Sequence, residues 1–204
     1  ASDVYKRQQY IQSSQKVGPS MADDIKNAAF LAVVFAMFCM AAYILLRFRD
    51  ISFSVGAFAS VAVTTLCIIS FYTLLWKVLP FSMEVDQTFI AAILTIIGYS
   101  INDTVVVFDR IRETIGLYPK RDRYQVINDA LNSTLSRTFN TSLTTLVVVL
   151  CIFILGGATI RSFTFAILLG SIIGTYSTLF VATPIAYELQ KKKINKKAAA
   201  EAGK

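Results

Sequence analysis

The sequence predicts an all-α integral membrane protein built around a five-helix transmembrane bundle. Of its 204 residues, 55% are hydrophobic and only 16% are charged, whereas soluble domains carry roughly 25% charged residues. The apolar residues are gathered in five intervals of 20 to 26 residues that contain a single charged residue between them. A helix needs about 20 apolar residues to cross the hydrocarbon core of a membrane. Because lipid offers the backbone no hydrogen-bond partner, each interval is predicted to be a helix.

Charged residues mark where each predicted span begins and ends. The predicted spans are, in order along the chain, residues 28–46, 54–76, 87–108, 138–155 and 162–187, within a transmembrane domain over residues 27–187. Residues 1–26 are predicted to be the end of a truncated extracytoplasmic domain, with a hinge at Val17-Gly18-Pro19, so the native protein is expected to begin further upstream. Residues 188–204 are predicted to be a basic cytoplasmic tail.

The distribution of positive charge predicts the orientation of these spans. With the carboxyl terminus inside, the inner segments hold 14 Lys and Arg residues and the outer segments hold six. Cytoplasmic segments of membrane proteins carry the excess of Lys and Arg. We therefore expect the amino-terminal end of this chain outside the cell and the carboxyl-terminal tail in the cytoplasm.

The one long segment between spans, residues 110–136, is predicted to be cytoplasmic. Tyr124, Ile127, Leu131 and Leu135 recur in it at helical spacing, with polar residues around the rest of the turn. This pattern predicts an amphipathic helix that lies on the membrane surface or against the bundle. The alternative is a solvated connector with one apolar side.

Several function classes find no support in the sequence. The chain has no histidine, and its three cysteines lie inside apolar intervals at spacings that fit no metal site. We expect those cysteines to be buried free thiols. Neither a Gly-rich phosphate loop nor a catalytic triad is present, so no enzyme activity and no cofactor are predicted. The net charge is +7, and the Lys and Arg residues lie in short segments between the spans and in the tail Lys191–Lys197. This distribution is typical of charge that sets membrane topology and not of nucleic-acid binding.

Asp103 is the charged residue inside a predicted span. A carboxylate at that depth costs about 2.5–3.5 kcal/mol on insertion scales, and such residues usually mark an ion or proton path. Tyr99, Asp103, Val106 and Arg110 share one helix face. An Arg at the mouth of the next span, Arg137, can approach that face.

We predict that Asp103 and Arg137 couple the protein to a proton gradient, because the proton occupancy of a carboxyl group depends on water access and on nearby cations. A structural role for Asp103, as a link between helices, stays open. The supporting polar residues are Asn102, Thr104, Asn140, Thr141 and Thr144. Small residues mark the predicted helix contacts, since they let helices approach closely in membranes. These are Gly98, the Gly170–Gly174 pair, and a stripe of Gly56, Ser60 and Thr64.

Residues 98–113, Gly-Tyr-Ser-Ile-Asn-Asp-Thr-Val-Val-Val-Phe-Asp-Arg-Ile-Arg-Glu, resemble the hallmark of the SecF family of protein-export membrane subunits. Supporting similarity lies at Val17–Pro19, Leu135–Thr138, Thr141–Thr145 and Gly174–Ser177. The resemblance covers nearly all of the chain from Val17 onward. It implies half of a pseudo-symmetric membrane domain of the resistance-nodulation-division (RND) type, placed in a bacterial inner membrane and in contact with its lipid.

The resemblance also implies function and partners. Members pair with SecD, as separate chains or fused in one, act beside the SecYEG channel and YidC on translocating preproteins, and use the proton-motive force to promote export. Asp103 and Arg137 fall on the family positions associated with proton coupling. One departure is that many members carry a His-Asp pair where this chain has Val63-Thr64.

Three questions stay open at the level of sequence. The coupling ion is H⁺ or Na⁺. The chain could instead be an RND-type component for small-molecule efflux, which would need a duplicated membrane half. It could also be a passive membrane scaffold for translocase assembly, with Asp103 in a structural role.

The predicted orientation can be tested with single cysteines in a cysteine-free background. Cysteines introduced at Gln12 and Asn195 should react with a membrane-impermeant thiol reagent from opposite sides of the membrane, because an odd number of spans separates them. Labelling of both positions from the same side would overturn the predicted topology.

Overall fold

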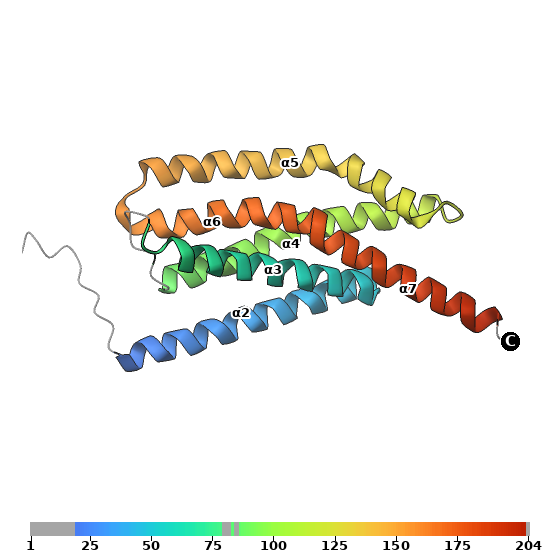
Figure 1. The fold of residues 1–204 in the computed structure, drawn as a ribbon. Coiled ribbons are helices and arrows are strands. Elements are labelled where there is room, and N and C mark those ends of the chain that lie inside the picture. Colours follow the sequence, from blue (N-terminus) through green and yellow to red (C-terminus); the bar gives the residue numbers. More distant parts are fainter. Residues whose placement is uncertain (1–18, 79–82, 84–85, 203–204) are drawn as a thin grey trace, which may run out of the picture.

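The computed structural model describes residues 19–78, 83 and 86–202, and every element in that part of the chain is a helix (Figure 1). The helices are α2 (Pro19–Phe48), α3 (Ile51–Leu75), α4 (Gln87–Leu117), α5 (Arg123–Leu155) and α6 (Ala158–Ser177). A π-helical turn, η1 (Thr178–Ala182), joins α6 to α7 (Thr183–Ala202). Five helical segments are long and apolar enough to cross a membrane, as predicted. Val17 and Gly18 of the predicted hinge lie outside the described residues.

The helices run well past the apolar intervals that predicted them. The segment predicted as a cytoplasmic loop, 110–136, consists of the last turns of α4, a short connection at 118–122 and the first turns of α5. The predicted basic tail is helical as far as Ala202. A charged residue ends an apolar interval, but α4, α5 and α7 continue through charged segments. A helix can do so outside the hydrocarbon core, because water there solvates its polar side chains.

The amphipathic helix predicted around residues 124–135 exists as the first part of α5, but its buried face is rotated from the predicted one. Tyr124 is 63% exposed and Leu135 is 42% exposed, whereas Ile127 is buried and Leu131 packs against the same core cluster, so only part of the predicted apolar stripe contacts the bundle. The buried residues of this part are Val126, Ile127, Ala130, Thr134 and Thr138. Packing against α4 and α6 sets the inward face of α5, and close packing selects small side chains over large ones.

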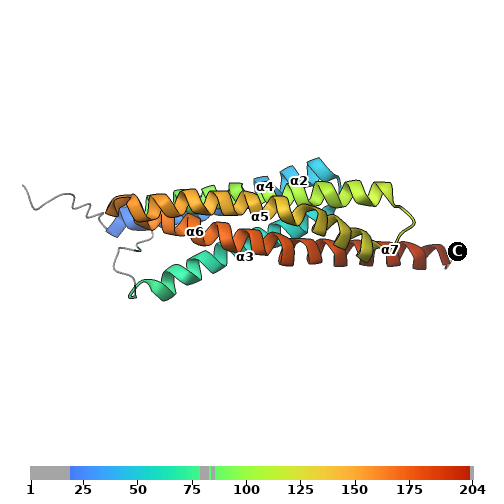
Figure 2. The ribbon, with the colours of Figure 1, turned by 90° about the horizontal axis from the view of Figure 1, so that it is seen from above.

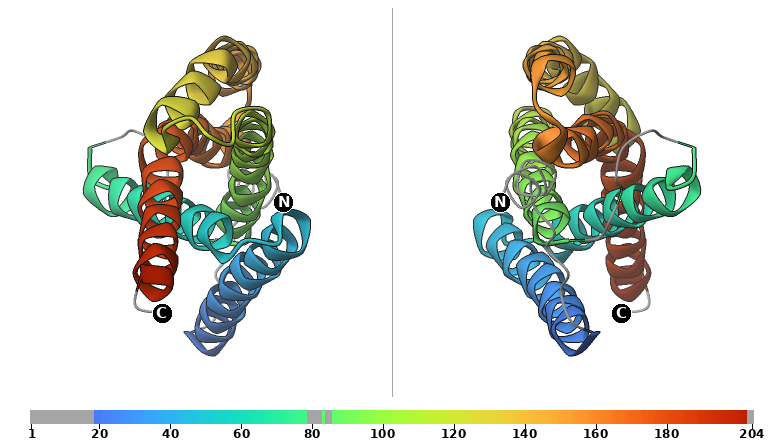
Figure 3. Two further views of the ribbon diagram at one scale, coloured as in Figure 1. Left: turned by 90° about the vertical axis from the view of Figure 1, so that its right-hand side faces the viewer. Right: turned by 90° about the vertical axis from the view of Figure 1, so that its left-hand side faces the viewer.

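The helices lie side by side in one bundle with α4 and α6 near its centre (Figures 1 and 3). Helices α2 and α5 lie at opposite edges. One end of the bundle holds the α2–α3 turn, the α4–α5 connection and α7, which extends beyond the other helices (Figure 2). We call this end the α7 end. By the predicted orientation, the α7 end faces the cytoplasm.

Three aspartates start helices, and two of them, Asp50 and Asp86, also bound apolar intervals. Asp50 accepts a hydrogen bond from the Ser52 amide at the start of α3 (3.1 Å), and Asp86 accepts one from the Phe89 amide at the start of α4 (2.9 Å). Asp122 does the same for α5 with the amides of residues 124 and 125. Such caps satisfy amides that have no partner within the helix.

The core has two apolar clusters with a layer of hydroxyl groups between them. One cluster surrounds Tyr72, Phe89 and Ile96, and the other surrounds Phe53 and Phe108. The hydroxyl layer comes from α3, α4 and the α6–η1 segment, and each of its residues is at most 1% exposed: Ser60, Thr64, Ser100, Thr104, Ser177 and Thr178. It links helices directly, through Ser60 to Ser177 (2.9 Å) and Thr104 to Thr178 (3.0 Å).

The π-helical turn η1 lies just before Pro184. Proline has no N–H to donate to the carbonyl one turn earlier, and its ring crowds that carbonyl. The wider turn of a π-helix accommodates this defect without ending the helix. Thr183 donates its hydroxyl to the Thr178 carbonyl at 3.2 Å. The segment α6–η1–α7 therefore continues as one rod from the membrane domain into the basic tail.

The small residues differ in what they contact. Gly170 is buried so tightly against Ile96 that a Cβ would collide with that side chain, and a Cβ at Gly174 would touch Ser100 at 3.4 Å. Gly98 is exposed, and a Cβ there would meet no described atom within 4 Å, so it makes no close helix contact within this chain. Two of the three thiols, Cys39 and Cys151, are exposed on the bundle surface, where we had predicted buried positions.

Alanine substitutions at two glycines should have opposite effects on stability. Gly170→Ala should destabilise the fold by about 1–3 kcal/mol, because the stiff, buried Ile96 must move aside. The matched variant Gly98→Ala should be neutral or stabilise by about 0.5–1 kcal/mol, since alanine is the better helix former and has room. Thermal unfolding of both variants in detergent measures the difference. Equal stability of the two variants would contradict the packing described for α4 and α6.

Candidate functional site

Asp103 lies in the middle of the bundle on α4 and is only 5% exposed. Its backbone position follows from the apolar periodicity of α4, whose buried face includes Ile96, Ser100, Asp103 and Val107. The charge that the sequence places inside a span is therefore turned toward other helices and away from lipid. A buried carboxyl group needs partners from the protein or from water.

Three polar atoms near this position have no hydrogen-bond partner among the described residues. They are Asp103 Oδ2, the Tyr99 hydroxyl and Ser100 Oγ, all on α4 within about one turn of one another. Buried polar groups in proteins are nearly always paired, so each exception calls for an explanation. A buried carboxyl oxygen without a partner is suited to binding a proton or a water molecule.

Two residues of α5 act on the Asp103 carboxyl group. They are Ser142, through its hydroxyl, and Arg137, through its charge. Ser142 also shares a short hydrogen bond with Thr175 of α6 (Oγ to Oγ1, 2.6 Å), so the site spans three helices. The Arg137 guanidinium makes no ion pair or hydrogen bond with another described residue.

A cleft of about 620 Å³ opens between α4 and α5 on the α7 side of Asp103. Its walls run along α4 from Val106 to Gly116 and along α5 from Ser133 to Arg137. Val106 lies one helical turn from Asp103. The cleft therefore brings space for water to within about one turn of the buried carboxyl group.

The other charges that line the cleft are engaged elsewhere. Arg110 pairs with Glu113 (2.8 Å) and donates to Ser133 Oγ (3.0 Å). Asp109 pairs with Arg47 of α2 at 3.1 Å. These pairs are about half exposed and contribute little stability, but they occupy the carboxylates that would otherwise attract Arg137. Arg137 is left as the cation available to Asp103.

The predicted supporting residues are divided between the core and the surface. Thr104 is fully buried and bonds Thr178, so it links α4 to η1. Thr141 is half-buried and donates to the Arg137 carbonyl at 2.9 Å. Asn102, Asn140 and Thr144 are exposed on the surface of this chain. The structure thus brings Arg137 toward Asp103 but leaves part of the predicted polar stripe outside the bundle.

Sequence reasoning missed Ser142 and the face of α5 on which it lies. That face consists of small residues four apart, namely Ala130, Thr134, Thr138 and Ser142. Ala130, Thr134 and Thr138 are buried against the neighbouring helices. The row of small residues at every fourth position is visible in the sequence. The predicted stripe of Arg137, Asn140, Thr141 and Thr144 lies on the adjacent face of the helix and drew attention away from it.

The whole membrane region is similar to one family of known proteins. The family model described as protein export membrane protein SecD/SecF, C-terminal, matches residues 1–192. Protein translocase subunit SecF of Rhodothermus marinus is 48% identical over 176 residues, which cover 86% of this chain and 57% of that protein. The corresponding subunit of Petrotoga mobilis is 40% identical over 183 residues, covering 90% of this chain and 58% of that protein. The chain thus spans a little under three fifths of these relatives.

Solved structures agree with this similarity. A crystal structure of SecDF, a translocon-associated membrane protein from Thermus thermophilus, superimposes with a TM-score of 0.76 at 39% identity, over 86% of this chain and 23% of that one. A second SecDF structure, in a super-membrane-facing form, gives a TM-score of 0.76 at 32% identity, over 98% of this chain and 27% of that one. The arrangement of helices around Asp103 is therefore the one found in these larger proteins.

The water access inferred for the cleft can be tested with two cysteines on α4. In a cysteine-free background, Val106→Cys should react with a charged thiol reagent added from the α7 side, because the reaction needs a thiolate and therefore water. Thr104→Cys, two residues away in a fully buried position, should not react. An unreactive Val106→Cys, with a reactive cysteine at Asn195 as positive control, would contradict a water-filled cleft.

Proposed function

The chain belongs to the SecD/SecF family of protein-export membrane proteins, and we propose that it is the membrane part of a SecF-type translocase subunit that uses the proton-motive force to promote protein export. The observation that carries the proposal is the buried Asp103 carboxyl group, whose Oδ2 has no partner among the described residues, one helical turn from a cleft that Arg137 lines without an ion pair of its own. A group so placed can take up a proton from one side and release it when the helices move.

In this proposal Asp103 alternates between a protonated and an ionised state. Water in the cleft delivers or accepts the proton on the α7 side, and Arg137 stabilises the ionised carboxylate when it moves closer. Ser142 connects this event to α6 through Thr175. Moving one charge through the membrane potential is worth about 2.3 kcal/mol per 100 mV, which is enough to bias a conformational cycle.

The proposed partner is SecD, as a separate chain or fused upstream, and through it the SecYEG channel and possible neighbours such as YidC. Support comes from the polar residues that this chain leaves exposed within its spans, Asn102, Asn140 and Thr144. Polar side chains in a membrane are rarely turned toward lipid. A second half-bundle that covers them would complete a pseudo-symmetric RND-type domain. Translocating preproteins are the proposed substrates, and the α7 end is proposed to face the cytoplasm of a bacterial cell.

This chain has Val63-Thr64 where many family members carry a His-Asp pair, and this difference is consistent with proton coupling that depends mainly on Asp103. Val63 is 38% exposed, and Thr64 is 1% exposed and donates to the Ser60 carbonyl at 2.9 Å. Neither side chain can carry a proton in the manner of the His-Asp pair of other members. We therefore propose that coupling in this half of the protein depends on Asp103 and Arg137.

Replacing Asp103 by Asn should abolish stimulation of export by a proton gradient while leaving the fold intact. The amide has the shape of the carboxyl group but cannot exchange a proton. The measurement is late-stage export of a reporter into vesicles with an imposed gradient, using the full-length protein with its SecD partner. Asp129→Asn is the matched control, because it removes an exposed carboxylate that pairs with Arg121. Unchanged stimulation by Asp103→Asn, at equal protein level, would favour a passive scaffold.

A conservative change at the cation should also impair coupling. Arg137→Lys keeps the charge but loses the planar fork of donors that can hold a carboxylate in a fixed geometry. We expect reduced stimulation in the same assay, with Arg121→Lys as the matched control. Wild-type stimulation by Arg137→Lys would remove Arg137 from the proposed pair and leave Asp103 to work with residues of SecD.

A further inference from the structure

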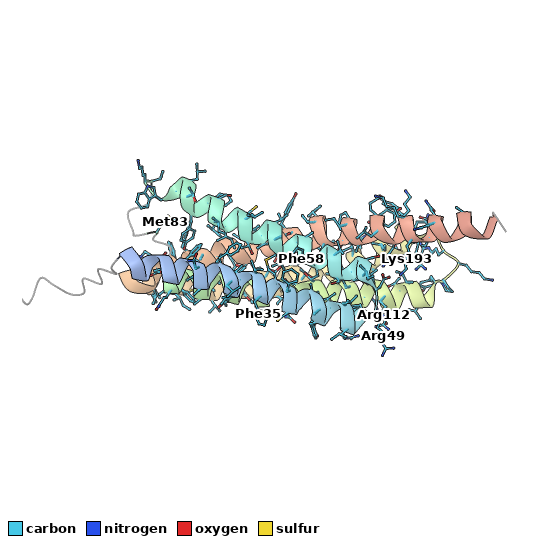
Figure 4. The ribbon with its side chains drawn as sticks, turned by 90° about the horizontal axis from the view of Figure 1, so that it is seen from below. Phe35, Arg49, Phe58, Met83, Arg112 and Lys193 are labelled. Carbon is cyan, nitrogen blue, oxygen red and sulfur yellow. The ribbon has the colours of Figure 1, made fainter. Side chains whose placement is uncertain are left out.

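A second cavity, of about 350 Å³, lies at the α7 end, away from Asp103. It is enclosed by the α2–α3 turn, the end of α4, the start of α5 and the middle of α7. Four cations line it, Arg49, Arg112, Arg123 and Lys193, with Asp50 as the one acid. Figure 4 shows Arg49, Arg112 and Lys193 gathered at this end of the molecule. We call this cavity the basic pocket.

The positive charge of the basic pocket is not neutralised within the described chain. Asp50 accepts from Lys193 Nζ at 3.4 Å while it caps α3. Arg112 donates to the Arg47 carbonyl at 3.4 Å, which is a neutral partner. The side chains of Arg49 and Arg123 make no hydrogen bond or ion pair with a described residue. The pocket is therefore short of negative charge.

Two of these cations occupy positions that local structure disfavours. Arg49 has a φ of 52°, a left-handed conformation that glycine adopts most readily, at the turn that follows α2. Arg123 is the first residue of α5, where the helix dipole repels positive charge. The charge of Arg49 suits the carboxyl-terminal end of α2, but its left-handed backbone would suit glycine better, and the charge of Arg123 does not suit the start of α5. Both guanidinium groups are thus placed at some local cost and free to bind a ligand.

Apart from Gln190, the remaining walls of the basic pocket are apolar. Phe48 and Phe53 line it and pack on each other and on Phe108, with ring centroids 4.8 to 6.1 Å apart. Beside the pocket, Leu46 and Ile51 expose 78% and 68% of their surface at the ends of two membrane-spanning helices. A ligand that fits this arrangement is anionic where it enters the pocket and hydrocarbon where it leaves.

We propose that the basic pocket binds the phosphodiester headgroup of an anionic phospholipid from the leaflet at the α7 end. Basic pockets between transmembrane helices bind such headgroups. Arg49, Arg112 and Arg123 bind the phosphate oxygens, and the acyl chains lie along the exposed apolar side of the α2–α3 turn. With three cations in excess, a lipid with two phosphates, such as cardiolipin, binds more tightly than phosphatidylglycerol with one.

The site rests on the proposed membrane placement of the α7 end but not on proton coupling. It borders the cleft all the same, because Arg112 lines both cavities. A bound headgroup would hold the α2–α3 turn, the ends of α4 and α5, and α7 in one arrangement. The lipid would thereby fix the relative positions of α4 and α5, the helices that carry Asp103 and Arg137.

Thermal unfolding of the purified protein in detergent, titrated with defined lipids, tests the proposal. Cardiolipin and phosphatidylglycerol should raise the unfolding temperature and phosphatidylcholine should not. The double variant Arg49→Gly/Arg123→Gln should weaken the apparent affinity for cardiolipin roughly thirtyfold, because each basic residue at an anionic lipid contributes about a factor of five. Its fold should survive, since glycine suits the left-handed turn and the start of α5 is relieved of a cation.

The matched control removes the same charge from outside the pocket. Lys192→Gln/Lys196→Gln, two exposed residues of α7, should change the affinity less than about threefold, because screened surface charges contribute little. Equal losses in both double variants would show diffuse charge attraction and overturn the site.

Equal protection by inorganic phosphate would assign the pocket to a free anion. Protection by a polyglutamate peptide but not by lipid would assign it to an acidic protein segment. The last two outcomes would also overturn the lipid proposal, and none of them bears on the Asp103 export assay.

Discussion

In hydrocarbon, a polar group must find its hydrogen-bond partner within the protein, and this constraint governs the bundle. The hydroxyl groups meet it cheaply. Thr64 and Thr104 each donate to the carbonyl four residues earlier in their own helix, and Thr104 then shares its oxygen with Thr178 across the bundle. A carboxyl group cannot do the same when ionised, because it has no proton to give to a carbonyl. An ionised Asp103 therefore needs donors from α5 or from water, and a cleft that could admit water begins one helical turn away at Val106.

The same constraint explains why this chain resembles one half of a larger assembly. Most of its buried hydroxyl groups are bonded within the chain, and the exposed Thr144 hydroxyl donates to carbonyls of its own helix. The amide groups of Asn102 and Asn140, however, are turned outward at the depth of the predicted spans. Amide and hydroxyl groups in lipid cost free energy unless they are bonded. Gly98, one turn from Asn102, has open space where a second helix could come close. The sequence predicted a close helix contact at Gly98, and no described residue of this chain makes one. We propose that a helix of SecD makes this contact.

The sequence predicted the spans and the central charge well because both follow from the cost of burying charge. The absence of charge between Lys26 and Arg47 is sufficient to predict a span. Asp103 was identified for the same reason, because it is the one charged residue between Asp86 and Asp109. The extent of the helices was not predictable by that route, since the last turns of α4 and the first turns of α5 are rich in charged residues. The inward face of α5 was also missed. Packing against α4 and α6 selects small residues such as Thr134, Thr138 and Ser142, whereas hydropathy draws attention to large ones such as Tyr124 and Leu135, which are exposed.

The hydroxyl layer differs from Asp103 in that its side chains cannot hold a charge. Serine and threonine hydroxyls can pass a hydrogen bond along but do not ionise, so the layer formed by Ser60, Thr64 and Ser177 cannot store a proton. The position at which relatives carry a His-Asp pair holds Val63 and Thr64, and Thr64 belongs to this layer. Among the described residues at the depth of that layer, Asp103 is the one acidic group. In the proposed coupling, a proton that drives this half of the bundle therefore has one described carboxyl group to bind at this depth, and the charge state of that group would depend on how closely Arg137 and water in the cleft approach it.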